Sequence, residues 1–219
     1  MDVGRVMAKS PLFNEDYYEH GVTKKLSGYE NYHYMPTRSY EEAITFSTIV
    51  QGKTLDYGCA KGFLVHCLRQ IGVDAWGEDI SEYCLTHCHP RVAQFLSKPT
   101  NSPYDTIICK DVMEHVDEND AGEVLRYLMG RCHLGIFVIP LGDNDKFRIR
   151  EYELDSTHVT KKDEDWWIDH FRDLGYGVKL AYSLGDVKKK WQPVDNRGNG
   201  FFFVTNPSRI PSTVFDAQP

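Results

Sequence analysis

Short apolar segments alternate with helix-like segments from residue 53 onward, and this alternation most constrains the fold. Five segments are short, apolar and bounded by turn residues, which predicts strands over residues 53–57, 74–80, 92–96, 104–109 and 134–139. Helices are predicted over residues 39–50, 63–71, 81–87, 121–129 and 163–174 from helical spacing and capping residues. Strands that alternate with helices are typical of an open α/β sheet whose strands run parallel.

The two ends of the chain depart from this alternation. Residues 1 to about 36 are rich in tyrosine and are expected to be irregular, so that residues 1–38 form an aromatic lid segment beside a main domain of residues 39–219. Near the other end, strands are predicted over residues 178–184 and 201–205, with the turn-rich run Asn196–Gly200 between them. A final hairpin of this kind predicts an antiparallel edge on the sheet.

Composition and charge restrict the partners and the compartment. The 219 residues carry a net charge of −7, whereas binding to duplex nucleic acid needs a basic surface, so no nucleic-acid partner is expected. The run Lys188–Lys190 is expected to be solvated in a polar loop. No apolar run is long enough to span a membrane, and no secretory signal is visible. The six cysteines form no CxxC pair and are expected to be buried free thiols, which favours the cytoplasm.

A glycine-rich turn follows the first predicted strand, where ligands bind in open α/β sheets. The segment Asp56–Gly62 has the spacing GxAxG, whereas a dinucleotide site would have GxGxxG. The small residues allow the backbone to approach a ligand closely, and the acidic Asp56 precedes the first glycine by two residues. This combination favours a cationic, amino-acid-like ligand over a diphosphate. Asp79 ends the second predicted strand, where an acidic residue can bind ribose hydroxyls.

Three segments together resemble the motifs of class I S-adenosylmethionine-dependent methyltransferases. They are Leu55–Gly62, Gly77–Ser81 and Tyr104–Val116, and the resemblance extends over about residues 40 to 205. It implies S-adenosylmethionine as cofactor and a Rossmann-like fold: an open seven-stranded, mostly parallel sheet with an antiparallel C-terminal hairpin and helices on both faces. Ala60 departs from the pattern, which more often has glycine, and an alanine should fit there if its φ is negative.

The resemblance also implies a role for each matching residue. The methionine part of the cofactor would lie against the glycine turn and the end of the fourth strand, and the ribose and adenine against the end of the second strand. Arg38 is a candidate for the cofactor carboxylate, although a surface position at a helix start is expected instead. The implied cofactor-binding residues are Asp56, Tyr57, Gly58, Cys59, Ala60, Gly62, Asp79, Ile80, Lys110 and Asp111.

Two histidines are candidates for the base that an alcohol acceptor requires. His115 follows the fourth strand, and His158 lies in a stretch that resembles the "D-x-T-H" stretch of small-molecule and sugar methyltransferases. The run Asp111–His115 resembles the acid-x-x-Glu-His pattern of ubiquinone-pathway O-methyltransferases, which can hold a divalent cation. We favour a bracing role for Glu114 and His115, and therefore predict no metal site.

The expected function is methyl transfer to a hydroxyl of a small molecule or sugar. Three alternatives stay open at this point: N-methylation of a small molecule, a nicotinamide-dependent oxidoreductase on a similar sheet, and a non-catalytic module that keeps the cofactor fold. The oligomeric state and the identity of the acceptor do not follow from the sequence.

Overall fold

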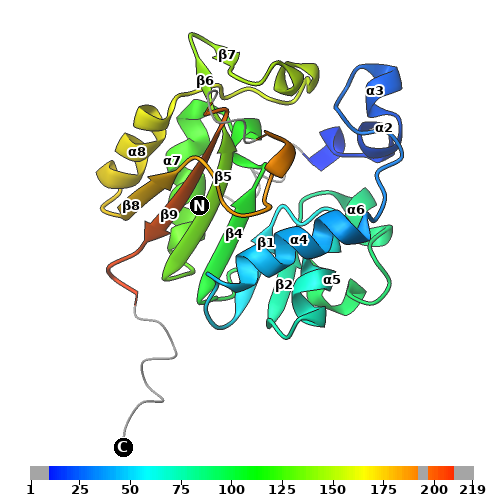
Figure 1. Cartoon of the computed structure of the whole chain (residues 1–219), viewed down its shortest axis with the longest axis horizontal. Helices are drawn as coiled ribbons and strands as arrows, with labels where there is room; N and C mark the ends of the chain where they lie inside the picture. Colours follow the sequence, from blue (N-terminus) through cyan, green and yellow to red (C-terminus); the bar gives the residue numbers. More distant parts are fainter. Residues whose placement is uncertain (1–9, 192–196, 210–219) are drawn as a thin grey trace, which may run out of the picture.

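A seven-stranded sheet forms the centre of the computed structural model, which describes residues 10–191 and 197–209. The strand order is β3-β2-β1-β4-β5-β9-β8 (Figure 1). Neighbouring strands from β3 to β5 are parallel, whereas β9 is antiparallel to both β5 and β8. The predicted fold class is therefore confirmed. The strands are β1 (Thr54–Tyr57), β2 (Ala75–Glu78), β3 (Leu96–Ser97), β4 (Thr106–Lys110), β5 (Leu134–Pro140), β8 (Gly177–Ala181) and β9 (Asn199–Thr205).

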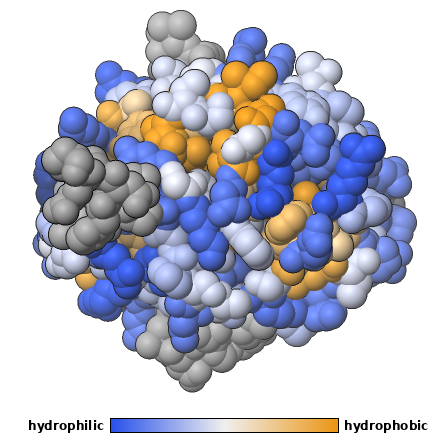
Figure 2. All heavy atoms as spheres, turned by 90° about the horizontal axis from the view of Figure 1, so that it is seen from below, coloured by the Kyte–Doolittle hydropathy of each residue, from blue (hydrophilic) through white to orange (hydrophobic). Residues whose placement is uncertain are grey.

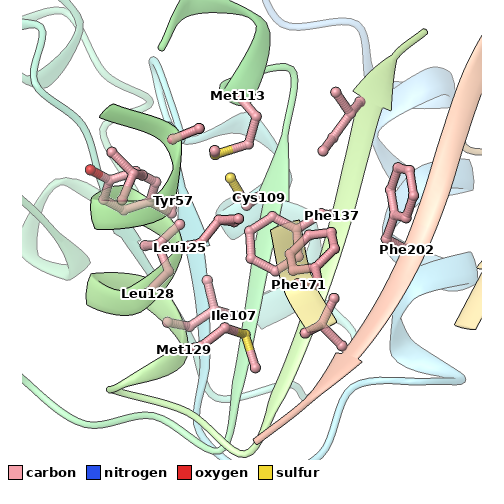
Figure 3. Packing of buried hydrophobic residues seen from close by; sticks show 14 of the residues in the cluster. Tyr57, Ile107, Cys109, Met113, Leu125, Leu128, Met129, Phe137, Phe171 and Phe202 are labelled. Carbon is pink, nitrogen blue, oxygen red and sulfur yellow. The ribbon is translucent and has the colours of Figure 1, made fainter. Parts of the chain in front are cut away.

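Helices cover both faces of the sheet, because its central strands are apolar on both sides. In β4, Ile107 and Cys109 face one apolar cluster and Ile108 faces the other, as the two-residue repeat of a strand requires. The first cluster includes side chains of α7 and α8 (Figure 3), and the second includes side chains of α4 and α5. The α-helices from residue 36 onward in the described residues are α4 (Pro36–Ser47), α5 (Phe63–Gln70), α6 (Glu82–Thr86), α7 (Glu118–Met129) and α8 (Glu164–Asp173).

The third strand is shorter and later than predicted. Residues Ala93–Phe95 form a 3-10 helix, and only Leu96 and Ser97 pair with β2. Val92 is buried in the cluster beneath α5, so its apolar character reflects packing of a turn against the core rather than a strand. The prediction of a strand over residues 92–96 was therefore wrong in its placement, although a strand does exist at this edge.

Residues 10 to 24 are more ordered than the predicted irregular segment. They contain a 3-10 helix (Ser10–Leu12) and two short helices, α2 (Glu15–Glu19) and α3 (Gly21–Lys24). The side chain of Asn14 caps α2 by accepting a hydrogen bond from the Tyr17 amide at 3.2 Å. Helices this short depend on tertiary packing, here through buried tyrosines, rather than on intrinsic propensity.

The loops after β5 and β8 also differ from the predictions. A small hairpin joins β6 (Gly142–Asp143) to β7 (Lys146–Phe147), and Asn144 and Asp145 form its turn with positive φ. The turn predicted over Asn196–Gly200 falls partly outside the described residues, and Asn199 and Gly200 already belong to β9. On the face in Figure 2, hydrophobic residues form separate patches among hydrophilic ones. Within the described part of the chain, no helix has the length and apolar character that crossing a membrane requires.

Candidate active site

The glycine turn after β1 has a left-handed backbone at three alternating positions. Gly58, Ala60 and Gly62 have φ of 80°, 47° and 74°. The condition under which an alanine was expected to fit, a negative φ, is therefore not met, and Ala60 adopts a conformation that glycine adopts more readily. The amides of Gly58 and Cys59 donate to the carbonyl of Glu78 at 2.7 and 3.2 Å, which ties the turn to the end of β2.

Asp79 holds the same turn from the neighbouring strand. One of its carboxylate oxygens accepts the amide hydrogen of Ala60 and the other accepts that of Ser81, each at 2.7 Å. The side chain is buried, which raises the pKa of Asp79 although the two amides favour the carboxylate. Asp79 therefore organises the loop besides lying where a ribose is expected.

The predicted cofactor-binding residues surround one cavity of about 230 Å³ at the carboxyl ends of the strands. Gly62 is not among the residues that line it. A Cβ at Gly62 would meet Leu96 at 2.7 Å and Val92 at 3.1 Å, so this glycine allows the turn to pack against β3. The sequence-predicted residues that line the cavity are Asp56, Tyr57, Gly58, Cys59, Ala60, Asp79, Ile80, Lys110, Asp111 and His115.

A charged wall closes one side of the cavity. Burial raises the pKa of Asp56 to about 7, with Asp79 and Glu42 adding to the shift and Lys110 opposing it. Lys110 lies 3.1 Å from an oxygen of Asp111 and 3.7 Å from one of Glu42. Arg38 lines the cavity as well, half exposed, with its Nε 3.3 Å from Glu42.

Glu42 is a cavity residue that the sequence interpretation missed. It lies on α4 four residues before Phe46, which is fully buried, so the two share the stripe of the helix that faces the core. A carboxylate on such a stripe needs a counter-charge, and that pattern could have identified it. The cavity wall therefore holds both carboxylates, Asp56 and Glu42, and cations, Lys110 and Arg38, and such a wall suits a ligand that carries both an ammonium and a carboxylate group.

His115 and His158 lie together, but only His115 lines the cavity. Their ring centroids are 4.6 Å apart. The hydroxyl of Thr157 donates to Asp155 at 2.6 Å and lies 2.8 Å from Nδ1 of His115, so this Nδ1 carries the hydrogen. The Nδ1–H of His158 donates to the carbonyl of Tyr152 at 2.8 Å.

Glu114 lies behind these two rings. It is 1% exposed, and its Oε2 has no hydrogen-bond partner among the described residues. Burial and the charge of Asp111 raise the pKa of Glu114 to about 8, whereas burial and the neighbouring His158 lower the pKa of His115 to about 4. Both shifts favour the neutral forms, as expected where burial is the largest cause of the shift.

The same cluster is compact enough for a cation. Ligand atoms of Glu114, His115 and His158 all lie within 4.8 Å of one another. An orphaned carboxylate oxygen with two imidazoles, each held through Nδ1 by an oxygen atom, is a donor set that fits a divalent metal. Asp111 does not belong to this group, since Lys110 and Lys188 bind its carboxylate. The trio Asp111, Glu114 and His115 that resembled a metal motif is therefore not the one that the fold brings together.

The N-terminal residues form the outer wall of the cavity. Phe13, Tyr17 and Tyr18 pack in one cluster with Ala60 and Ile80 of the two cofactor loops. Hydrogen bonds and an ion pair connect this wall to residues 155–156 and to Lys61. They are Tyr17 Oη to Asp155 at 2.6 Å, the Ser156 amide to the Leu26 carbonyl at 2.9 Å, Lys61 to Glu19 at 2.5 Å and Lys61 to the Tyr32 carbonyl at 2.9 Å.

Comparison with known proteins gives one family match, described as a methyltransferase domain, over residues 30–129. Residues 30–129 match this methyltransferase-domain model, and the chain has the class I methyltransferase fold of the solved structures. A search of curated proteins finds no match. The predictions of an S-adenosylmethionine-dependent methyltransferase and of S-adenosylmethionine as its cofactor are thereby confirmed, and the nicotinamide-dependent alternative loses its support.

Solved structures of low sequence identity share the fold. Magnesium protoporphyrin IX methyltransferase from Synechocystis PCC 6803, with bound SAH, is 16% identical with a TM-score of 0.56, over 78% of this chain and 83% of that one. A SAM-dependent methyltransferase from Archaeoglobus fulgidus is 14% identical with a TM-score of 0.58, over 78% and 93%. The mitomycin 7-O-methyltransferase is 11% identical with a TM-score of 0.58, over 78% and 53%.

Proposed function

We propose that the enzyme transfers the methyl group of S-adenosylmethionine to a hydroxyl of a small molecule or sugar. The observation that carries this proposal is the pair His115 and His158, with His115 on the cavity wall and Glu114 behind them. A hydroxyl must lose its proton as it is methylated, whereas a neutral amine can attack without a base. Paired imidazoles beside the cofactor cavity supply the function that an alcohol needs.

In the proposed mechanism the protein aligns two reactants and accepts one proton. When bound, S-adenosylmethionine would supply an electrophilic methyl group on its sulfonium, and the acceptor oxygen would form the O–CH₃ bond as the S–CH₃ electron pair returns to sulfur. The hydroxyl proton passes to Nε2 of His115, because Nδ1 of this ring already carries a hydrogen bonded to Thr157. The nearby carboxylate of Asp155 favours the resulting imidazolium. The aromatic wall of the N-terminal segment is proposed to act as the lid that excludes water.

The acceptor class rests on charge and on the enclosure of the site. The net charge of −7 disfavours a polyanionic acceptor, and the tyrosine-rich wall leaves a small cavity. The names of similar structures include an O-methyltransferase of mitomycin and a small RNA methyltransferase, so both oxygen acceptors and RNA occur on this fold. We propose a small acceptor and a soluble, cytoplasmic enzyme.

The test is transfer of labelled methyl from S-adenosylmethionine to a panel of phenols, sugars, amines matched to those alcohols, and a short RNA. We expect labelled ethers, with activity lost by at least about a hundredfold in the variant His115→Ala, as for removal of a general base. His133→Ala is the control, because this partly exposed histidine directly precedes β5, at the end of that strand away from the cavity. Label on amines or RNA alone would overturn the proposal. Loss of activity with a chelator, restored by Mn²⁺ or Mg²⁺, would show that the histidine cluster works through a cation instead.

A further inference from the structure

The loop between β8 and β9 places the buried ammonium group of Lys188 beside the active site. The prediction that Lys188–Lys190 is solvated was wrong for its first member: the side chain of Lys188 is 3% exposed, whereas that of Lys189 is 69% exposed. Val187 is fully buried and anchors the loop in the apolar cluster beneath α4 and α5. This segment, orange in Figure 1, returns toward the end of β4.

Three oxygen atoms satisfy the Lys188 ammonium. It forms an ion pair with Asp111 Oδ1 and donates to Tyr152 Oη at 2.8 Å and to Asn199 Oδ1 at 3.0 Å. Three acceptors match the three donors of an ammonium group. Burial alone would lower the pKa of Lys188, but the Asp111 carboxylate holds it above its ordinary value. The lysine is thus a fixed charge whose position is set on three sides.

The partners of Lys188 belong to the two halves of the active site. Asp111 lines the cofactor cavity and has a left-handed backbone, with φ of 58°. Tyr152 belongs to the 3-10 helix Arg150–Leu154 that follows β7, and its carbonyl accepts the Nδ1–H of His158. We propose that Lys188 is a positioning residue of methyl transfer, which fixes Asp111 beside the cofactor and, through Tyr152, orients His158 beside the acceptor. The second half of this inference rests on the proposed function, and the first half rests on the cofactor alone.

Loss of Lys188 would leave the cofactor side short of positive charge. Lys110 would then be the cation nearest to Asp111, although it also lies close to the carboxylate of Glu42. The other cation beside Glu42 is Arg38, whose side chain is half exposed. A partly buried carboxylate that loses one of its two cations must either move or take up a proton, and both responses disturb the wall of the cavity. Removing the lysine should therefore weaken cofactor binding without any direct contact to the cofactor.

The experiment is calorimetric titration with S-adenosylhomocysteine of the full chain and its variants. We expect Lys188→Met to weaken binding by about tenfold or more, as for truncation of one partner of a buried ion pair. Lys188→Arg should restore most of the affinity, and Lys189→Met should bind as the wild type does. Asp111→Asn added to Lys188→Met should cause little further loss, because coupled residues are not additive. A lysine with a merely structural role would give additive losses.

Imidazole nitrogen NMR gives a second readout that a merely structural role would not change. His158 should be the Nδ1–H tautomer in the wild type and in Lys189→Met, and a mixture of tautomers in Lys188→Met. If Lys188→Met does not fold, Lys188→Arg and Asp111→Asn provide the test. Weaker binding by Asp111→Asn together with near-normal binding by Lys188→Arg supports the inference. Normal binding by Asp111→Asn together with weak binding by Lys188→Arg overturns it. Unchanged affinity in a folded Lys188→Met overturns this inference alone, whereas no binding by the wild type overturns the cofactor assignment as well.

Discussion

The affinity for S-adenosylhomocysteine should rise with pH between 6 and 7, because Asp56 must ionise to accept the ligand ammonium. Asp56 is 5% exposed, and burial raises its pKa to about 7. In the free protein the carboxyl is therefore largely protonated at pH 6. The ammonium of a bound ligand would favour the carboxylate, so binding would release the proton. The perturbation is a change of pH alone, with no substitution in the site.

The magnitude follows from the fraction of Asp56 that is ionised. With a pKa of about 7, roughly one carboxyl in eleven is ionised at pH 6 and about half at pH 7. The apparent affinity scales with the competent fraction, so binding should be about fivefold tighter at pH 7 than at pH 6. At pH 6 each binding event should release about 0.9 proton. His115, with a pKa of about 4, does not titrate in this window.

Calorimetry at pH 6 in two buffers of different ionisation enthalpy measures both the dissociation constant and the proton count. Asp56→Asn is the matched control, because its amide cannot ionise, and its affinity should be weak and constant between pH 6 and pH 7. Affinity of the wild type that does not change with pH, or the same pH dependence in Asp56→Asn, would refute the assignment of Asp56 as the ammonium partner.

Three substitutions give further expected outcomes. Asp79→Ala should abolish binding of S-adenosylhomocysteine in calorimetry and lower the free energy of unfolding by about 3 kcal/mol, since two hydrogen bonds to a carboxylate are lost. Arg131→Met should lower the free energy of unfolding in urea by about 3–5 kcal/mol, because it leaves the fully buried Glu78 without its counter-charge. Tyr17→Phe should cost about 1 kcal/mol of stability through its lost bond to Asp155, and should raise the KM of the acceptor if the N-terminal segment acts as a lid.

Each of these substitutions has a control and a contradicting outcome. Arg126→Met changes an arginine on the outer face of α7, and equal losses for Arg126→Met and Arg131→Met would show that the buried pair is not the cause. An Asp79→Asn variant that binds S-adenosylhomocysteine as tightly as the wild type would mean that binding does not need the negative charge of the Asp79 carboxylate. A Tyr17→Phe variant with wild-type stability would show that the bond to Asp155 does not hold the N-terminal segment.

The sheet and the cofactor loops could be predicted because their signals are local. Strand and helix periods are read within one segment, and the carboxyl ends of parallel strands meet at one edge of the sheet. Residues that follow β1, β2 and β4 were therefore expected to share a cavity, and they do, with Gly62 turned instead toward β3. The φ of Ala60 could not be predicted, because Asp79 holds that conformation from another strand.

The partners of buried charged residues could not be predicted from local sequence patterns. Glu78 was recognisable as an acidic residue inside a strand, but its partner Arg131 lies 53 positions along the chain. Asp111 directly follows β4 whereas its partner Lys188 lies on the loop before β9, and Lys61 reaches Glu19 across 42 positions. Since an unpaired buried charge is costly, the sequence implies that a counter-charge exists without saying which one it is. In this enzyme those distant partners lie beside the active site, so the residues that local patterns cannot identify are the ones that hold the predictable motif in place.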